Sequence, residues 1–342
     1  MIHNVRQTGE SMRHISLVIF IALSVATTVV AQTENWKPPR MADGRVNLQG
    51  VWANNAATPL ERPDSLADKT TFSANEVEQL RETADRLFGG ADDAAFGDGV
   101  FNAVLANIQR NVSNDGETGN YSSVWMVDRE FENRTSLISD PLNGKLPAIT
   151  RSAERRFADA AAHRRDHPAD GPEDLSRQLR CVTYGIPRFG GLGAGYNSYY
   201  QIFQTSDYVV MLGEMIHDAR IIPIGDMPHI HKSIRQWHGD SRGHWEGDTL
   251  VVETTNYSPK ASYRGAAEHL HLIERFSLGG PETLHYEITI TDPTVWTQPW
   301  VAMAPLSRSS DVLYEYACHE GNYGLVGILA GARVQEAEAL SR

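Results

Sequence analysis

Cysteine is nearly absent from the 342-residue chain, which contains only Cys181 and Cys318. Two cysteines cannot supply the four thiolate ligands of a structural zinc site, so this class of metal site is excluded. In an oxidising compartment a single pair of cysteines predicts one disulfide, which here would close a very long loop. The alternative is a pair of buried free thiols.

Positive charge is also scarce. The chain has 31 Lys and Arg against 43 Asp and Glu, which gives a formal net charge of −12. Binding to phosphate groups requires a basic face, so we expect no nucleic-acid partner. No dense block of Lys and Arg indicates adhesion to an anionic membrane. The composition, with 41% hydrophobic and 22% charged residues, is typical of a soluble globular protein.

Long apolar runs are limited to residues 15–30, which follow Arg13 and His14 and precede Ala31. A basic start, an apolar middle and a small residue at the cleavage point predict a secretory signal peptide over residues 1–31. The run is shorter than the roughly 20 residues of a membrane span. We therefore expect a periplasmic or secreted protein without stable membrane insertion after signal removal. A retained single-helix anchor is the alternative.

Two motifs of known enzyme classes occur only in unsuitable contexts. The glycine-rich residues 190–195 lead into a predicted strand, whereas a dinucleotide-binding loop must open a helix. Residues 239–243 match G-x-S-x-G around Ser241, but hairpin-forming residues follow them, whereas a nucleophile elbow requires a helix there. Nucleotide binding is rejected, and a hydrolase that uses Ser241 remains an alternative.

The strongest local signal lies in residues 237–257. Leu250, Val251 and Val252 have the side chains that strands favour, and the turn at Gly247 precedes them. We therefore predict a hairpin of residues 243–246 and 249–257. Further strands are predicted at residues 199–205, 208–217, 219–224, 270–278, 284–291, 300–306 and 312–318.

These regularly spaced strands predict a mainly β fold over residues 181–342. We expect an antiparallel barrel, calycin- or lipocalin-like, or a sandwich, and a barrel of about eight strands has room for a small ligand. Residues 32–180 are predicted to form an N-terminal mixed α and irregular wrap with two helices, capped by Ser73 and Thr150. Asn322 is predicted to cap a C-terminal helix.

Acidic residues on apolar strand faces provide the main functional hypothesis. Glu214, Glu253 and Glu274 each fall among apolar residues when the predicted strands are read in alternation. A buried carboxylate is costly unless it is paired or protonated, and a cavity of low dielectric constant suits general acid–base catalysis. The alternative is a structural network of buried Glu–Arg pairs.

We predict that Glu253 or Glu274 acts as the base or acid, that His217 is its partner, and that Asp240 and Arg242 position the substrate. The substrate-binding residues are predicted to be Glu214, Arg220, Trp237, His238, Trp245 and Tyr257. The predicted protein is a cofactor-free lyase, hydratase, isomerase or cyclase that acts on a small, largely apolar organic substrate.

Two His-x-His pairs, His229 with His231 and His269 with His271, can each place both imidazoles on one strand face. Such pairs ligate metals in several barrel folds. The first pair falls in a predicted loop and the second on a predicted solvated face, so no metal site is predicted. A hydrolase with a His-bound metal and a non-catalytic small-ligand-binding protein remain alternatives, and no oligomeric state is assigned.

Residues 237–256 (WHGDSRGHWEGDTLVVETTN) and 314–324 (YEYACHEGNYG) resemble a large family of exported bacterial proteins of unknown function. Residues 215–223 (MIHDARIIP) and 41–52 (MADGRVNLQGVW) are similar to the same pattern. The resemblance covers most of the chain after the predicted signal peptide and implies an exported single unit. It implies no catalytic residue.

Overall fold

The computed structural model describes residues 36–88, 98–107, 129–183 and 198–341. The chain divides into two compact units, Met1–Pro39 and Arg40–Arg342, and every element below belongs to the second unit. The predicted signal peptide and the glycine-rich residues 190–195 lie outside the described residues.

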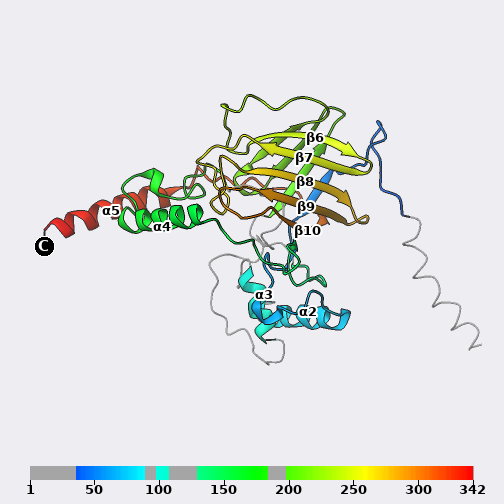
Figure 1. Ribbon diagram of the computed structural model, residues 1–342, viewed down its shortest axis with the longest axis horizontal. Coiled ribbons are helices and arrows are strands. Elements are labelled where there is room, and N and C mark those ends of the chain that lie inside the picture. Colours follow the sequence, from blue (N-terminus) through cyan, green and yellow to red (C-terminus); the bar gives the residue numbers. More distant parts are fainter. Residues whose placement is uncertain (1–35, 89–97, 108–128, 184–197, 342) are drawn as a thin grey trace, which may run out of the picture. The chain divides into compact units, whose positions relative to one another are not determined.

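One antiparallel sheet of ten strands organises the second unit, and Figure 1 shows β6 to β10 side by side within it. The strand order is β5-β4-β3-β1-β10-β9-β8-β7-β6, with β2 also paired to β10. The mainly β, antiparallel prediction is therefore confirmed. The strands are β1 Gly50–Ala53, β2 Ile138–Asp140, β3 Tyr199–Gln204, β4 Tyr208–Gly213, β5 Ala219–Pro223, β6 Asp240–Glu246, β7 Thr249–Thr255, β8 His271–Leu278, β9 Thr283–Thr291 and β10 Trp300–Ser309.

Three helices begin where the sequence predicts their N-terminal caps. Ser73 Oγ accepts from the backbone N of Glu76, Thr150 Oγ1 accepts from the N of Ala153, and Asn322 Oδ1 accepts from the N of Leu325. A third helix before β3, α3 Asp98–Asn107, is not among the two helices that the sequence predicts for residues 32–180. No helix in the described ranges is long and apolar enough to cross a membrane. The helices are α2 Ala74–Phe88, α3 Asp98–Asn107, α4 Arg151–Asp166 and α5 Tyr323–Leu340, with short 3-10 turns η1 Asp64–Leu66, η3 Pro172–Asp174 and η4 Met215–His217.

Glu76 in the first turn of α2 gives the helix a pH-dependent contact. The hydrogen bond from Lys69, followed by those from Ser73, lowers the pKa of Glu76 from 4.5 to about 2. A lowered folded-state pKa means that this contribution to stability is present above pH 4.5 and is lost as the pH falls towards 2. Ser73→Ala is expected to raise the pKa of Glu76 measured by NMR titration, whereas Ser73→Thr, which keeps the hydroxyl, is the control. An unchanged pKa in Ser73→Ala contradicts this assignment.

The N-terminal part of the second unit contributes a strand to the middle of the sheet. β1 pairs with β3 on one side and β10 on the other. Trp52 on β1 is fully buried, its Nε1 donates to the carbonyl of Leu48 at 2.9 Å, and the Arg308 guanidinium lies 4.2 Å from its ring centroid. The sequence predicts only the irregular part of the N-terminal wrap here, because the four residues of β1 are too few to show an alternation.

The end strands of the sheet, β5 and β6, approach each other without pairing as strands. Ile224 and Gly243 form an isolated parallel bridge, in which the N of Gly225 donates to the carbonyl of Gly243 at 2.8 Å. A Cβ atom at Gly243 would lie 2.6 Å from Ile224 Cδ1, so glycine permits this close approach. The strand ladder is open at this point, and the sheet is not a closed barrel.

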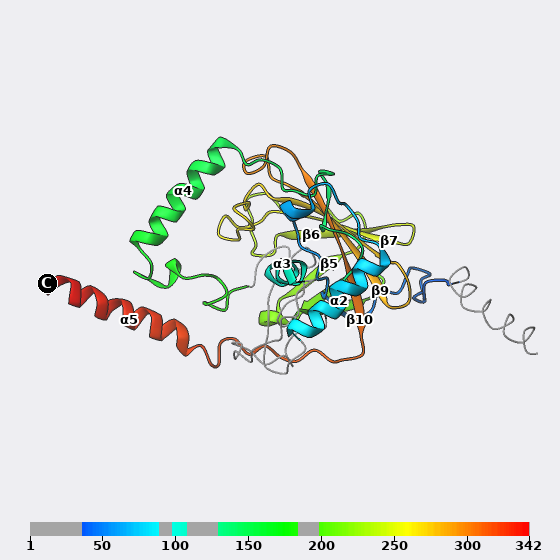
Figure 2. The same cartoon turned by 90° about the horizontal axis from the view of Figure 1, so that it is seen from below.

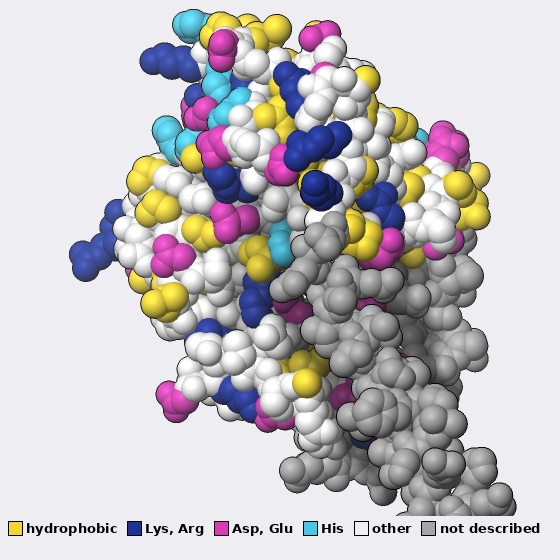
Figure 3. Space-filling view, turned by 90° about the vertical axis from the view of Figure 1, so that its right-hand side faces the viewer, with side chains coloured by type: hydrophobic (Ala, Val, Ile, Leu, Met, Phe, Trp, Pro, Cys, Tyr) yellow, Lys and Arg dark blue, Asp and Glu magenta, His cyan; other side chains and the backbone are white. Residues whose placement is uncertain are grey.

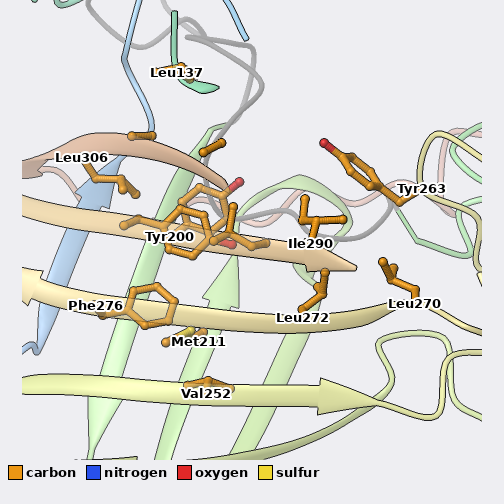
Figure 4. Packing of buried hydrophobic residues seen from close by; sticks show 14 of the residues in the cluster. Leu137, Tyr200, Met211, Val252, Tyr263, Leu270, Leu272, Phe276, Ile290 and Leu306 are labelled. Carbon is orange, nitrogen blue, oxygen red and sulfur yellow. The ribbon is translucent and has the colours of Figure 1, made fainter. Parts of the chain in front are cut away.

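Side chains from both halves of the sheet fill its interior. Figure 4 shows Tyr200 from β3 and Met211 from β4 in the same cluster as Phe276 from β8 and Val252 from β7. All four are buried, with exposed fractions of at most 1%. The centre of the sheet is a packed apolar core, whereas the barrel prediction expected a ligand cavity there.

The chain beyond β10 is fixed by the predicted disulfide, which is confirmed. Cys181 and Cys318 are bonded, with their Cα atoms 5.7 Å apart. The predicted strand at residues 312–318 is wrong, because β10 already pairs along both of its edges and the segment lies exposed. Figure 2 shows α5 after this segment, and Arg333 on α5 donates to the carbonyl of Asp170, just after α4, at 2.8 Å.

Candidate functional site

A pocket of about 670 Å³ lies between β5 and residues 235–242, the segment that leads into β6. The pocket is therefore built where the two ends of the sheet approach each other. Its β5 side is mainly apolar, and its other side carries polar and charged side chains. Five residues that the sequence predicts for the site line this pocket together: Arg220, Trp237, His238, Asp240 and Arg242.

His238 is held at the wall of this pocket by an acid. Its Nε2 lies 3.3 Å from Oδ1 of Asp218, and Thr183 Oγ1 donates to Oδ2 of Asp218 at 2.8 Å. The His238 side chain is 25% exposed, whereas that of Asp218 is 13% exposed. A carboxylate on one ring nitrogen fixes the orientation of an imidazole and leaves the other nitrogen for proton transfer. Sequence reasoning missed Asp218, which follows η4.

Asp240 is the centre of a second polar group. Its Oδ1 accepts from Arg242 Nη1 at 2.7 Å, and its Oδ2 accepts from the backbone N of Ile230 at 3.0 Å. The same Oδ2 lies 2.7 Å from Nδ1 of His229. These three contacts, two of them with cationic or ionisable groups, compensate the burial of the carboxylate. The sequence predicts Asp240 and Arg242 but not His229, which lies in a loop.

Glu253 lies on the outer side of β7. Its side chain is 48% exposed, whereas Thr254 next to it is fully buried. The interior placement expected for Glu253 is therefore wrong. Glu253 Oε1 lies 2.7 Å from Nε2 of His271, and Oε2 lies 3.7 Å from Nε2 of His229. The hydrogen bond with His271 lowers the pKa of Glu253 against a smaller opposing effect of burial.

Glu274 is fully buried, as the alternation along β8 predicts. Arg220 donates to both of its oxygens, at 3.0 and 2.6 Å, and Tyr286 OH donates to Oε1 at 2.9 Å. Burial opposes the charged form of Arg220, but the neighbouring Glu274 outweighs it, so the pKa of Arg220 is raised. Burial raises the pKa of Tyr286. This arrangement is the buried Glu–Arg pair of the structural alternative.

Ser241 lies within β6 and not at a turn between a strand and a helix. Its Oγ lies 3.0 Å from Thr254 Oγ1 and 3.3 Å from Arg220 Nη2. A hydroxyl and a guanidinium cannot take its proton as a general base does, so these contacts give no support to a Ser241 nucleophile. Tyr257 is buried beside the same group, and burial raises its pKa.

Three other predicted residues do not line the pocket. β4 ends at Gly213, so His217 lies beyond the strand and does not follow its alternation. His217 has a φ of 44° and is exposed, and its Nδ1 lies 3.2 Å from the carbonyl oxygen of Tyr316. Glu214 is buried, with an exposed fraction of 5%. Trp245 packs against the apolar core. Glu214 and His217 differ from the prediction because β4 stops four residues before the predicted end at residue 217.

The two imidazoles of each His-x-His pair have separate surroundings. His269 is exposed, whereas His271 Nε2 lies 2.7 Å from Glu253 Oε1. His229 contacts Asp240, whereas His231 is exposed and its Nδ1 lies 2.7 Å from Ser233 Oγ. Among the residues that the structure describes, no group of three or more His, Cys, Asp or Glu side chains is arranged to hold a metal ion.

The fold and the pocket together define a mainly β protein with a pocket of the size that small organic molecules occupy. Comparison with protein-family models, curated proteins and solved structures finds no match to the chain.

Proposed function

We propose that the protein is an exported, cofactor-free acid–base enzyme of the lyase, hydratase, isomerase or cyclase type. Its substrate is a small, largely apolar organic molecule, bound in the pocket between β5 and residues 235–242. The observation that carries this proposal is His238 at the pocket wall, with its Nε2 against Asp218. An oriented imidazole beside arginine side chains is a common arrangement for moving a proton at a carbon next to a polarised group.

In this proposal His238 takes a proton from the substrate and returns it at another atom of the substrate or its product. Asp218 acts as a positioning residue because it holds the imidazole and stabilises its protonated form. Arg242, fixed by Asp240 at 2.7 Å, stabilises negative charge that develops on a substrate oxygen. Glu274 is assigned a structural role here, since both of its oxygens are bonded to Arg220.

Export is supported by the disulfide between Cys181 and Cys318, because such bonds persist mainly in oxidising compartments. We therefore propose a periplasmic or secreted location. Fractionation of the source cells, with the disulfide state measured by thiol labelling of each fraction, tests this location directly.

The first experiment is native mass spectrometry with metal analysis on protein purified from the exported fraction. A co-purifying small molecule without stoichiometric metal is expected, and its chemical relatives supply an assay. His238→Gln is then expected to lower kcat by about 100-fold, the lower range for loss of a general acid or base. Asp218→Asn is expected to shift the pH dependence of kcat, because it alters the group that holds the imidazole.

His231→Gln is the matched control, since His231 is exposed and does not line the pocket. Stoichiometric zinc or iron contradicts the cofactor-free mechanism. Full turnover by His238→Gln contradicts the role of His238. A tightly bound ligand that wild-type protein never converts identifies the protein as a non-catalytic binding protein.

A further inference from the structure

Three of the twelve residues that line the pocket are arginines. The chain has a formal net charge of −12, and acidic and basic side chains are interspersed on the face in Figure 3. The pocket, in contrast, is lined by Arg220, Arg235 and Arg242, with Asp240 as the only acid among its lining residues. Guanidinium groups bind carboxylates and phosphates well, so three of them at one pocket favour an anionic ligand if one can exchange its present partner.

The three arginines differ in how firmly they are already paired. Arg220 is bonded to the fully buried Glu274, and Arg242 to the buried Asp240. Arg235 donates to Oε1 of Glu268 at 3.1 Å and to its backbone carbonyl at 3.0 Å, and the Glu268 side chain is 48% exposed. Exposed ion pairs contribute at most about 1 kcal/mol, so an incoming anion can compete for Arg235. Arg235 is therefore the cation available to a ligand.

The opposite side of the pocket is apolar. It is formed by Ala219, Ile221 and Pro223 on β5, and Ile221 is 65% exposed. Trp237 adds an aromatic side chain from the segment that carries Arg235. A ligand that satisfies both sides has an apolar body and an acidic group. The apolar body removes the exposed surface of Ile221 from water, and this burial favours binding.

We infer that the pocket binds a small organic carboxylate. Its carboxylate contacts Arg235, with Arg242 beside it, and its apolar body packs against Ile221 and Trp237. The one exchangeable guanidinium balances the single charge of a carboxylate, whereas it leaves the second charge of a phosphate dianion without a partner. This inference rests on the proposed function, because it names the substrate class of the same pocket.

Calorimetric titration with phenylacetate, 2-phenylethanol and phenyl phosphate tests the inference on the full chain. Phenylacetate is expected to bind about tenfold more tightly than the neutral alcohol, the advantage of one charge-assisted hydrogen-bonded contact. Arg235→Gln is expected to remove this preference while leaving the affinity for the alcohol unchanged. Arg275→Gln removes a surface arginine outside the pocket and is the control.

Equal binding of phenylacetate and the alcohol, absence of binding by all three probes, or a preference that survives Arg235→Gln overturns the inference. Tighter binding of phenyl phosphate than of phenylacetate overturns the choice of carboxylate. These outcomes are separate from the catalytic proposal. Binding of phenylacetate to the wild-type protein is measured without turnover, so a failure of catalysis leaves the carboxylate preference measurable.

Discussion

Arg220→Met is expected to lower the free energy of unfolding by about 3–5 kcal/mol, the usual cost of removing one partner of a buried ion pair. The physical reason is that Glu274 has no exposed surface and loses both hydrogen bonds from the guanidinium. Tyr286 OH remains as a donor but carries no charge to balance the carboxylate. Urea unfolding monitored by circular dichroism measures this change.

The matched control is Arg275→Met. Arg275 pairs with Glu246 at the surface, with side chains 36% and 49% exposed, so its loss is expected to cost less than about 1 kcal/mol. The double variant Arg220→Met with Glu274→Leu is expected to recover part of the loss, because no buried charge is left without a partner. Equal destabilisation by Arg220→Met and Arg275→Met contradicts the structural role given to the buried pair.

Two neighbouring strands show how much of the site the sequence predicts. On β8 the residues alternate clearly, so Glu274 is correctly placed on the buried face. On β7, Leu250, Val251 and Val252 are all buried. A continuous apolar run of this kind does not indicate which alternate residues of the strand face the core. A shift of one residue exchanges the two faces, and Glu253 was therefore placed on the wrong one.

The sequence does not predict the contacts across the opening between β5 and β6. Asp218 and His238 are 20 positions apart and belong to no common motif, and His229 reaches Asp240 from a loop. Local patterns fix strands, caps and turns, whereas these contacts depend on how far the sheet curves. Because side chains fill the interior of the sheet, the pocket lies at the opening between the two end strands and not in the interior.

Replacing both Cys181 and Cys318 with Ser is expected to lower the free energy of unfolding by about 4 kcal/mol. The cysteines are 137 positions apart, and all strands from β3 to β10 lie between them. Removal of the bond frees a very long loop in the unfolded chain, and this loss of constraint stabilises the unfolded state. Urea unfolding of the double variant and of reduced wild-type protein is expected to give the same decrease.

The same variant is expected to weaken the site, because Cys181 lies two positions before Thr183, which donates to Asp218 at 2.8 Å. Amide hydrogen exchange is expected to become faster at Thr183 and around His238, while the buried strands β8 and β9 exchange at rates set by global stability alone. The control is Glu274→Gln, which weakens the buried ion pair with Arg220. It is expected to lower global stability while the disulfide at Cys181 stays intact. If exchange at Thr183 rises equally in both variants, the disulfide acts only on the unfolded chain and does not hold the wall of the pocket.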